Sequence, residues 1–197
     1  MRELELKAVV TDSPALTSAL AAAGASLVFE GTMHDRRYDT VDRALVGRDE
    51  VLRLRVERSG AGERAALQYK GAASFPEGYK LRQEMGTQVS DAAMTHALLS
   101  ALGYVVTREI DRRVAVYELA GATVRVEWYP RMDTLVEVEG EPPTIEAAIT
   151  RLGLPRDAFS GDSLAAFATN YQLRTGVRAA ICDRELDDDF RYRIDDA

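Results

Sequence analysis

The strongest constraint on the fold is a repeated alternation of apolar and charged residues. A period of two is typical of β-strands that have one covered face and one polar face. The alternating segments are residues 3–7, 51–56, 65–70, 80–85, 114–118, 124–127 and 135–139, with a weaker candidate at 33–40. Glycines stand between successive segments, at Gly60, Gly62, Gly71, Gly78 and Gly121, and favour hairpin turns. The sequence therefore predicts a largely antiparallel sheet of seven or eight strands.

Helices are expected between and after these strands. Capping Ser and Asp residues, prolines at starts and glycines at ends predict helices over 13–24, 90–103 and 144–153, and from 162 onward. These helices can cover the apolar strand faces if the sheet curls with its charged face inward. We therefore expect an α+β fold, a closed antiparallel eight-stranded barrel with a charged lumen and helices packed outside. Its domain is expected to span residues 1–176, and 177–197 to form an acidic tail, partly disordered, or a docked arm.

The polar faces of the strands carry charges in pairs at positions i and i+2. These groups are Glu3, Glu5 and Lys7; Arg53 and Arg55; Lys80, Arg82 and Glu84; Arg125 and Glu127; and Glu137 and Glu139. An empty, dry lumen with so many charges would be costly, because each unpaired buried charge costs several kcal/mol. Lys and Arg bind phosphoryl oxygens, and clustered carboxylates are ligands for Mg²⁺ or Mn²⁺. The strand faces therefore predict a ligand with several phosphates together with a divalent metal.

The first strand also carries a family resemblance. Glu3-Leu-Glu-Leu-Lys7 resembles the ExExK signature of the CYTH superfamily, the triphosphate tunnel metalloenzymes. Further matches follow in family order: Arg37-Tyr38-Asp39-Thr40, Leu45, Leu52-Arg-Leu-Arg55, Lys70, Arg82 with Glu84, Arg112-Arg113, Tyr117, Arg125, Glu137-Val-Glu139 and Asn170-Tyr171. The resemblance covers roughly residues 1–175 and leaves the acidic C-terminal segment unexplained.

The resemblance implies roles for these side chains. Metal would be held by Glu3, Glu5, Glu137 and Glu139, and by Glu127, which stands where the family usually has aspartate. The triphosphate would be bound by Lys7, Arg53, Arg55, Lys70, Arg82, Arg113 and Arg125, with Arg112 as the alternative to Arg113. The implied activity depends on Mg²⁺ or Mn²⁺ and acts on a triphosphate.

Three functions remain open at this stage. We favour hydrolysis of an inorganic or organic triphosphate (tripolyphosphate, a nucleoside triphosphate or thiamine triphosphate), because no segment clearly builds an adenine pocket. The second reading is a class IV adenylyl cyclase, which converts ATP to cyclic AMP and pyrophosphate. The third is a non-catalytic module that binds polyphosphate or nucleotide; its four carboxylates would repel a polyanion unless metal is present.

Composition narrows the partners and the compartment. The net charge of −7 and a pI near 5.0 argue against nucleic-acid and anionic-membrane binding. The single cysteine, Cys182, cannot form an intrachain disulfide and fits a reducing compartment. No signal peptide or long apolar run is visible, so we expect a cytoplasmic protein. We expect it to be a monomer or a homodimer. His34 and His96 are isolated, and Trp128 and Tyr129 are expected to pack at a barrel rim.

Overall fold

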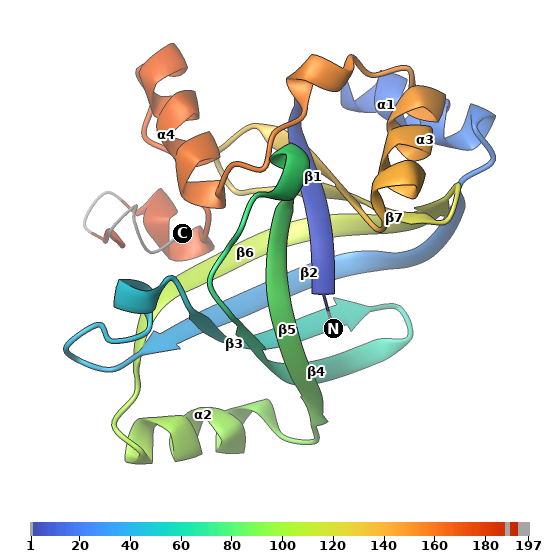
Figure 1. Cartoon of the computed structure of the whole chain (residues 1–197). Helices are drawn as coiled ribbons and strands as arrows, with labels where there is room; N and C mark the ends of the chain where they lie inside the picture. Colours follow the sequence, from blue (N-terminus) through green and yellow to red (C-terminus); the bar gives the residue numbers. More distant parts are fainter. Residues whose placement is uncertain (1, 188–189, 193–197) are drawn as a thin grey trace.

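The computed structural model describes residues 2–187 and 190–192, with side chains from Leu4 onward (Figure 1). Within these residues, eight strands close into an antiparallel barrel in the order β1-β5-β4-β3-β2-β6-β7-β8. The strands are β1 (Arg2–Val10), β2 (Ser26–Asp39), β3 (Val51–Ser59), β4 (Gly62–Lys70), β5 (Lys80–Val89), β6 (Val105–Leu119), β7 (Ala122–Trp128) and β8 (Thr134–Glu139). The predicted closed α+β barrel is confirmed.

Strands β2 and β6 are much longer than their alternation indicated. They have 14 and 15 residues and pair along nearly their whole length, with two shifts of register. Their extensions were missed because both strand faces carry charge, as in Asp111-Arg112-Arg113, so that apolar and polar residues do not alternate. Gly31 lets β3 approach β2 closely, since a Cβ there would lie 2.0 Å from the Arg58 carbonyl oxygen.

The predicted helices are present as α1 (Ser13–Ala22), α2 (Ala92–Ala101), α3 (Pro142–Leu152) and α4 (Leu164–Thr175). Short 3₁₀ turns are η1 (Val46–Arg48), η2 (Pro76–Gly78), η3 (Arg156–Ala158) and η4 (Asp183–Leu186). Helix α4 begins at Leu164 rather than at 162, because the Ser163 hydroxyl accepts a hydrogen bond from the Ala166 amide at 3.2 Å. Among the described helices, none combines the length and the apolar character that a membrane span requires.

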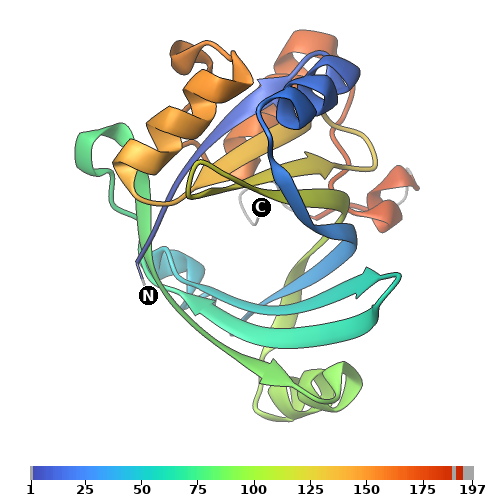
Figure 2. The same cartoon turned by 90° about the vertical axis from the view of Figure 1, so that its right-hand side faces the viewer.

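Most of the apolar core lies outside the barrel, and a small cluster of Met33, Val114 and Val116 lies on the inward faces of β2 and β6. Helices α1 and α3 lie together over β1, β7 and β8, and α2 lies on the opposite side (Figure 2). The larger cluster joins the outward faces of the strands to both helices: Leu6, Val124, Val136 and Val138 pack with Leu16, Leu20, Ile145 and Ile149. Under α2, Leu99 packs on Tyr38 and Leu54. Because these helices cover the outward faces, most positions on the inward strand faces are left for polar side chains.

The described part of the C-terminal segment packs along β6. Residues 179–182 are buried, and Ala180 pairs with Arg131 through two backbone hydrogen bonds of 2.8 and 2.9 Å. The Ile181 carbonyl accepts from the Asp111 amide at 2.8 Å. Residues 188–189 and 193–197 lie outside the described residues. The expectation of a partly disordered tail and the domain boundary at 176 therefore stay predictions.

Candidate functional site

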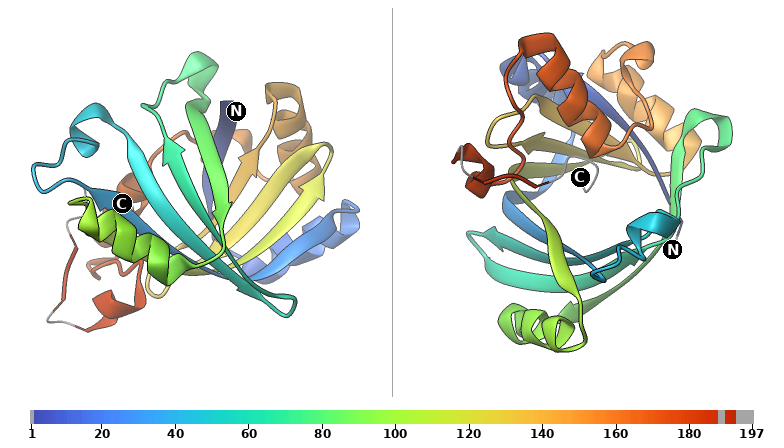
Figure 3. Two further views of the ribbon diagram at one scale, coloured as in Figure 1. Left: turned by 90° about the horizontal axis from the view of Figure 1, so that it is seen from below. Right: turned by 90° about the vertical axis from the view of Figure 1, so that its left-hand side faces the viewer.

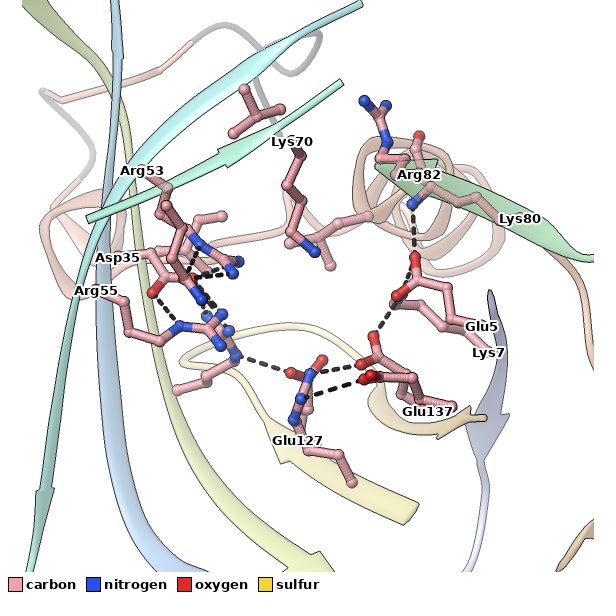
Figure 4. A pocket seen from close by; sticks show the side chains of 18 of the residues that line it. Glu5, Lys7, Asp35, Arg53, Arg55, Lys70, Lys80, Arg82, Glu127 and Glu137 are labelled. Carbon is pink, nitrogen blue, oxygen red and sulfur yellow. Dashed lines mark hydrogen bonds and ion pairs between the residues drawn. The ribbon is translucent and has the colours of Figure 1, made fainter. Parts of the chain in front are cut away.

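The barrel encloses a cavity of about 300 Å³ that is lined mainly by charged side chains (Figure 4). Its nine basic residues are Lys7, Arg37, Arg53, Arg55, Lys70, Lys80, Arg82, Arg112 and Arg125. Its six acidic residues are Glu5, Asp35, Glu84, Glu127, Glu137 and Glu139. The lining therefore carries an excess of positive charge inside a chain whose formal net charge is −7. Such a cavity favours an anionic ligand with several charges.

One side of the cavity is an arginine wall, formed by Asp35 and Arg37 of β2, Arg53 and Arg55 of β3, and Arg112 of β6. Asp35 is fully buried at its centre. Arg55 donates to its two oxygens at 2.7 and 2.9 Å, Arg112 at 3.1 Å and Arg53 at 3.3 Å. Burial alone would raise the pKa of Asp35, but Arg55, Arg112 and Arg53 hold it well below its usual value. Asp35 thus fixes three guanidinium groups in one place.

The arginine wall holds more positive charge than its single carboxylate balances. Burial and the neighbouring Arg53 lower the pKa of Arg37 to about 9. Burial and the neighbouring Arg55 lower the pKa of Arg53 to about 10. In both residues the charged form is disfavoured by lost hydration and by like charge. An anion bound against this wall would relieve both costs.

The opposite side is a carboxylate wall, formed by Glu5 and Lys7 of β1, Arg125 and Glu127 of β7, and Glu137 and Glu139 of β8. Here acids and bases alternate (Figure 4): Lys7 Nζ lies 2.8 Å from Glu5 and 2.5 Å from Glu137, and Arg125 lies 2.5 Å from Glu137. Burial opposes the charge on Lys7, but Glu137 and Glu5 raise its pKa. Lys7 therefore stays protonated.

A short chain of contacts links the two walls. Arg112, already bound to Asp35, donates to Glu127 at 2.9 Å, and the Tyr129 hydroxyl donates to the other Glu127 oxygen at 2.6 Å. Burial would raise the pKa of Glu127, but Arg112 and Arg125 lower it to about 2. Glu127 is therefore an ionised, fully engaged carboxylate in this structure.

Most of the predicted site residues line this cavity. They are Glu5, Lys7, Arg53, Arg55, Lys70, Arg82, Arg125, Glu127, Glu137 and Glu139. Arg82 lies at its edge, where its guanidinium donates to Asp49 and to the Gly71 carbonyl, each at 2.6 Å. The side chain of Glu3 is outside the described part of the structure; its backbone pairs with Arg82.

The placement of Arg113 in the tunnel was wrong. On β6 the inward positions are Ile110 and Arg112, so Arg113 points to the outer face. Its side chain is 55% exposed and lies over the Trp128 ring, 3.9 Å from the ring centroid. Arg112 takes the inner position, which was the stated alternative. Trp128 therefore stacks on an arginine side chain.

Several lining residues were not predicted as site residues, notably Asp35, Arg37, Gln68, Lys80 and Tyr129. Lys80 shares its strand face with Arg82 and Glu84, so the signal for it was present in the sequence. Asp35 and Arg37 also stand at i and i+2, but the charged Arg36 between them concealed the alternation. Only the pairing of β2 with β3 reveals that Asp35 stands opposite Arg55.

The carboxylate wall has the donor chemistry that Mg²⁺ or Mn²⁺ prefers. Glu5 and Glu139 are direct neighbours across β1 and β8, and carboxylate oxygens are hard ligands. Among the described residues, no three acidic, His or Cys side chains converge tightly enough to form a metal centre as they stand. Lys7 and Arg125 lie between the carboxylates and contact them. The residues fit a metal if these two cations turn toward a bound anion.

Comparison with models of protein families identifies the family to which this chain belongs. The model of the CYTH domain matches residues 1–151. The chain belongs to the CYTH family. The resemblance read from the Glu3–Lys7 segment and the later charged strands is thereby confirmed.

Solved structures support the same architecture for this CYTH chain. A Vibrio parahaemolyticus protein named as a candidate adenylate cyclase superposes with a TM-score of 0.70 at 18% identity, covering 85% of this chain and 97% of that one. A Pyrococcus horikoshii protein, PH1819, gives 0.67 at 21% identity, covering 89% and 99%. A Hippeastrum protein, HpAC1, gives 0.63 at 16% identity, covering 91% and 98%. At these identities the likeness shows the fold alone. No curated protein sequence matches the chain.

Proposed function

We propose that this CYTH protein hydrolyses a triphosphate in its barrel with the help of Mg²⁺ or Mn²⁺. The observation that carries the proposal is the division of one cavity into an arginine wall and a carboxylate wall. A polyphosphate would neutralise the excess positive charge of the arginine wall, and a divalent metal would bind the oxygens of the carboxylate wall. The structure described as HpAC1 from Hippeastrum is reported with a dominant triphosphatase activity, which supports this choice within the family.

The arginine wall would bind and orient the phosphate chain. Arg53, Arg55 and Arg112 are held by Asp35, so their remaining N–H groups are fixed before the ligand arrives. Fixed donors aimed at phosphoryl oxygens stabilise the charge of the transferring group without reorganising during the reaction. Arg37 extends this surface along β2.

The carboxylate wall would hold the metal through Glu5, Glu137 and Glu139, with Glu127 and Glu3 as further candidates. A bound metal supplies Lewis-acid chemistry and lowers the pKa of a coordinated water. Lys7 and Arg125, displaced from their carboxylates, would then contact the phosphates. Lys80, which lies 2.8 Å from Glu5, would do the same from β5.

The lining favours hydrolysis over cyclisation. Among the described lining residues, the apolar and aromatic side chains are Val51, Ile110, Tyr129 and Leu164, and the Tyr129 hydroxyl is committed to Glu127. An adenine ring normally needs a flat apolar surface with a few polar groups. We therefore propose hydrolysis, and the assay below distinguishes it from an adenylyl cyclase activity and from binding without catalysis.

One assay panel tests the proposal. The protein is incubated with Mg²⁺ or Mn²⁺ and with tripolyphosphate, ATP or thiamine triphosphate, and phosphate, pyrophosphate and cyclic AMP are measured separately. We expect release of phosphate. Formation of cyclic AMP together with pyrophosphate would instead establish the cyclase. No turnover of any of these substrates with either metal would count against an enzyme.

A further inference from the structure

The cation row of the arginine wall continues beyond the cavity to Arg108. On β2 and β6, Arg37 stands directly opposite Arg108, and Arg108, Ile110 and Arg112 occupy alternate positions of one strand face. Arg108 is only 3% exposed. A phosphate chain extending past Arg37 would therefore meet Arg108 next.

A carboxylate of the chain itself occupies that place. Glu185 lies in the C-terminal arm, defined here as residues 177–187, and is 5% exposed. Its two oxygens lie 3.0 and 3.1 Å from the two terminal nitrogens of Arg108. One of these oxygens also accepts from the amides of Ile181 and Cys182 at 2.9 and 3.3 Å. This paired arrangement is the strong form of a carboxylate–guanidinium contact.

The arm holds β6 from both faces at this point. Beside the contact of Glu185 with Arg108, Arg184 lies 3.2 Å from Glu109, which points to the other side of the strand. Figure 3 shows the arm beside one end of the barrel, next to α4. Family membership is established by residues 1–151, so the arm lies outside the segment that the family model matches.

We propose that the C-terminal arm sets the length of the phosphate chain that the tunnel accepts, with Glu185 closing the cation row at Arg108. This inference rests on the proposed function, because it concerns which polyphosphates reach the same site. With Glu185 paired to Arg108, the charge of this guanidinium is already neutralised, so a chain that extends past Arg37 gains no further cation there. Without Glu185, Arg108 extends the row and binds further phosphates of a longer chain.

The test compares binding of tripolyphosphate and of a long-chain inorganic polyphosphate by calorimetry, with turnover of both measured in parallel. The variant is Glu185→Gln, which keeps an oxygen for the backbone amides but loses the charge. The matched control is Arg184→Gln, which removes an arginine of the same arm whose side chain is 59% exposed and leaves the contact of Glu185 with Arg108 in place. For Glu185→Gln we expect affinity for the long chain to rise about tenfold relative to tripolyphosphate, equivalent to about 1.4 kcal/mol. For Arg184→Gln we expect no change in this ratio.

A double variant, Glu185→Gln with Arg108→Gln, keeps the test decisive if the single variant folds poorly, because it leaves no unbalanced buried charge. It should restore the discrimination of the wild-type protein, since the added cation is gone. A double variant that still prefers the longer chain would overturn the role of Arg108. An unchanged ratio in Glu185→Gln, in a protein that turns over tripolyphosphate, overturns the inference alone. If the wild-type protein neither binds nor hydrolyses tripolyphosphate, the proposed function itself is contradicted.

Discussion

The two walls of the tunnel compensate their buried charges in different ways. The arginine wall gathers Arg53, Arg55 and Arg112 around one carboxylate, Asp35, and so remains rich in positive charge. The carboxylate wall alternates, so that Lys7 lies between Glu5 and Glu137. In the arginine wall, several positive charges are held in fixed positions, so they can bind an anionic ligand without rearranging. In the carboxylate wall, each charge has a partner of opposite sign, and these ion pairs must separate before a ligand can bind. The difference indicates a phosphate site on one side and a metal site on the other.

The largest effect is expected on the carboxylate wall. Glu5→Gln removes a hard oxygen donor and the charge that Lys7 and Lys80 share. We expect turnover of tripolyphosphate to fall by about a hundredfold or more, the size seen when a group that stabilises the transition state is removed. Steady-state kinetics with Mn²⁺ measures it. Glu118→Gln, on an exposed position of β6, is the matched control and should retain full activity. Retained turnover in Glu5→Gln would contradict the proposal that this wall binds the metal.

A neighbouring pair of arginines tests the arginine wall. Arg112→Gln removes a cation that contacts both Asp35 and Glu127, whereas Arg113→Gln removes an exposed one. We expect kcat/KM for tripolyphosphate to fall by at least about tenfold in the first variant, as for loss of a buried charged contact, and to stay unchanged in the second. Thermal unfolding of both variants distinguishes lost binding from lost folding. Equal effects in the two would contradict the inward placement of Arg112.

The contact between the walls predicts an acid dependence of stability. The folded-state pKa of Glu127 is about 2, below the ordinary glutamate value of 4.5. Its stabilisation is therefore present above the unfolded-state pKa and lost as pH falls from about 4.5 to about 2. In Glu127→Gln, the free energy of unfolding should decline less steeply in this window, by up to about 1.4 kcal/mol per pH unit. Denaturant titrations at several pH values give the slopes, and identical slopes would show that Glu127 is not held ionised.

The smallest effect concerns Lys80. Burial and the neighbouring Lys7 lower its pKa, although Glu5 opposes the shift. Lys80 should therefore lose its proton, and its attraction for phosphate, at a lower pH than a free lysine. We expect KM for tripolyphosphate to rise a few-fold on the alkaline side, below the usual lysine pKa of about 10.4. Lys80→Arg keeps its charge to higher pH, so its KM should stay flat over the same range. A matching rise in this variant would assign the pH dependence elsewhere.

The sequence predicted the barrel because seven short segments alternate between apolar and polar residues. It predicted most of the lining because all the side chains on one face of a strand point to the same side of the sheet. It could not place Asp35 or the full length of β2 and β6, where charge occupies both faces. There the inner residues serve the lumen, while outer residues such as Glu109 and Asp111 hold the C-terminal arm. The same cause produced the error of one position at Arg113. Register across strands, rather than alternation along one strand, resolves such segments.

The most direct test of the two-wall account is calorimetric binding of tripolyphosphate with and without Mn²⁺. The proteins compared are the wild type, Glu5→Gln and Arg112→Gln. We predict that Mn²⁺ strengthens binding in the wild type and in Arg112→Gln, which keeps every carboxylate of the carboxylate wall, but not in Glu5→Gln. Without metal, Arg112→Gln should bind more weakly than the wild type. A Mn²⁺ effect of equal size in all three proteins, or in none, would contradict the division of the tunnel into a phosphate side and a metal side.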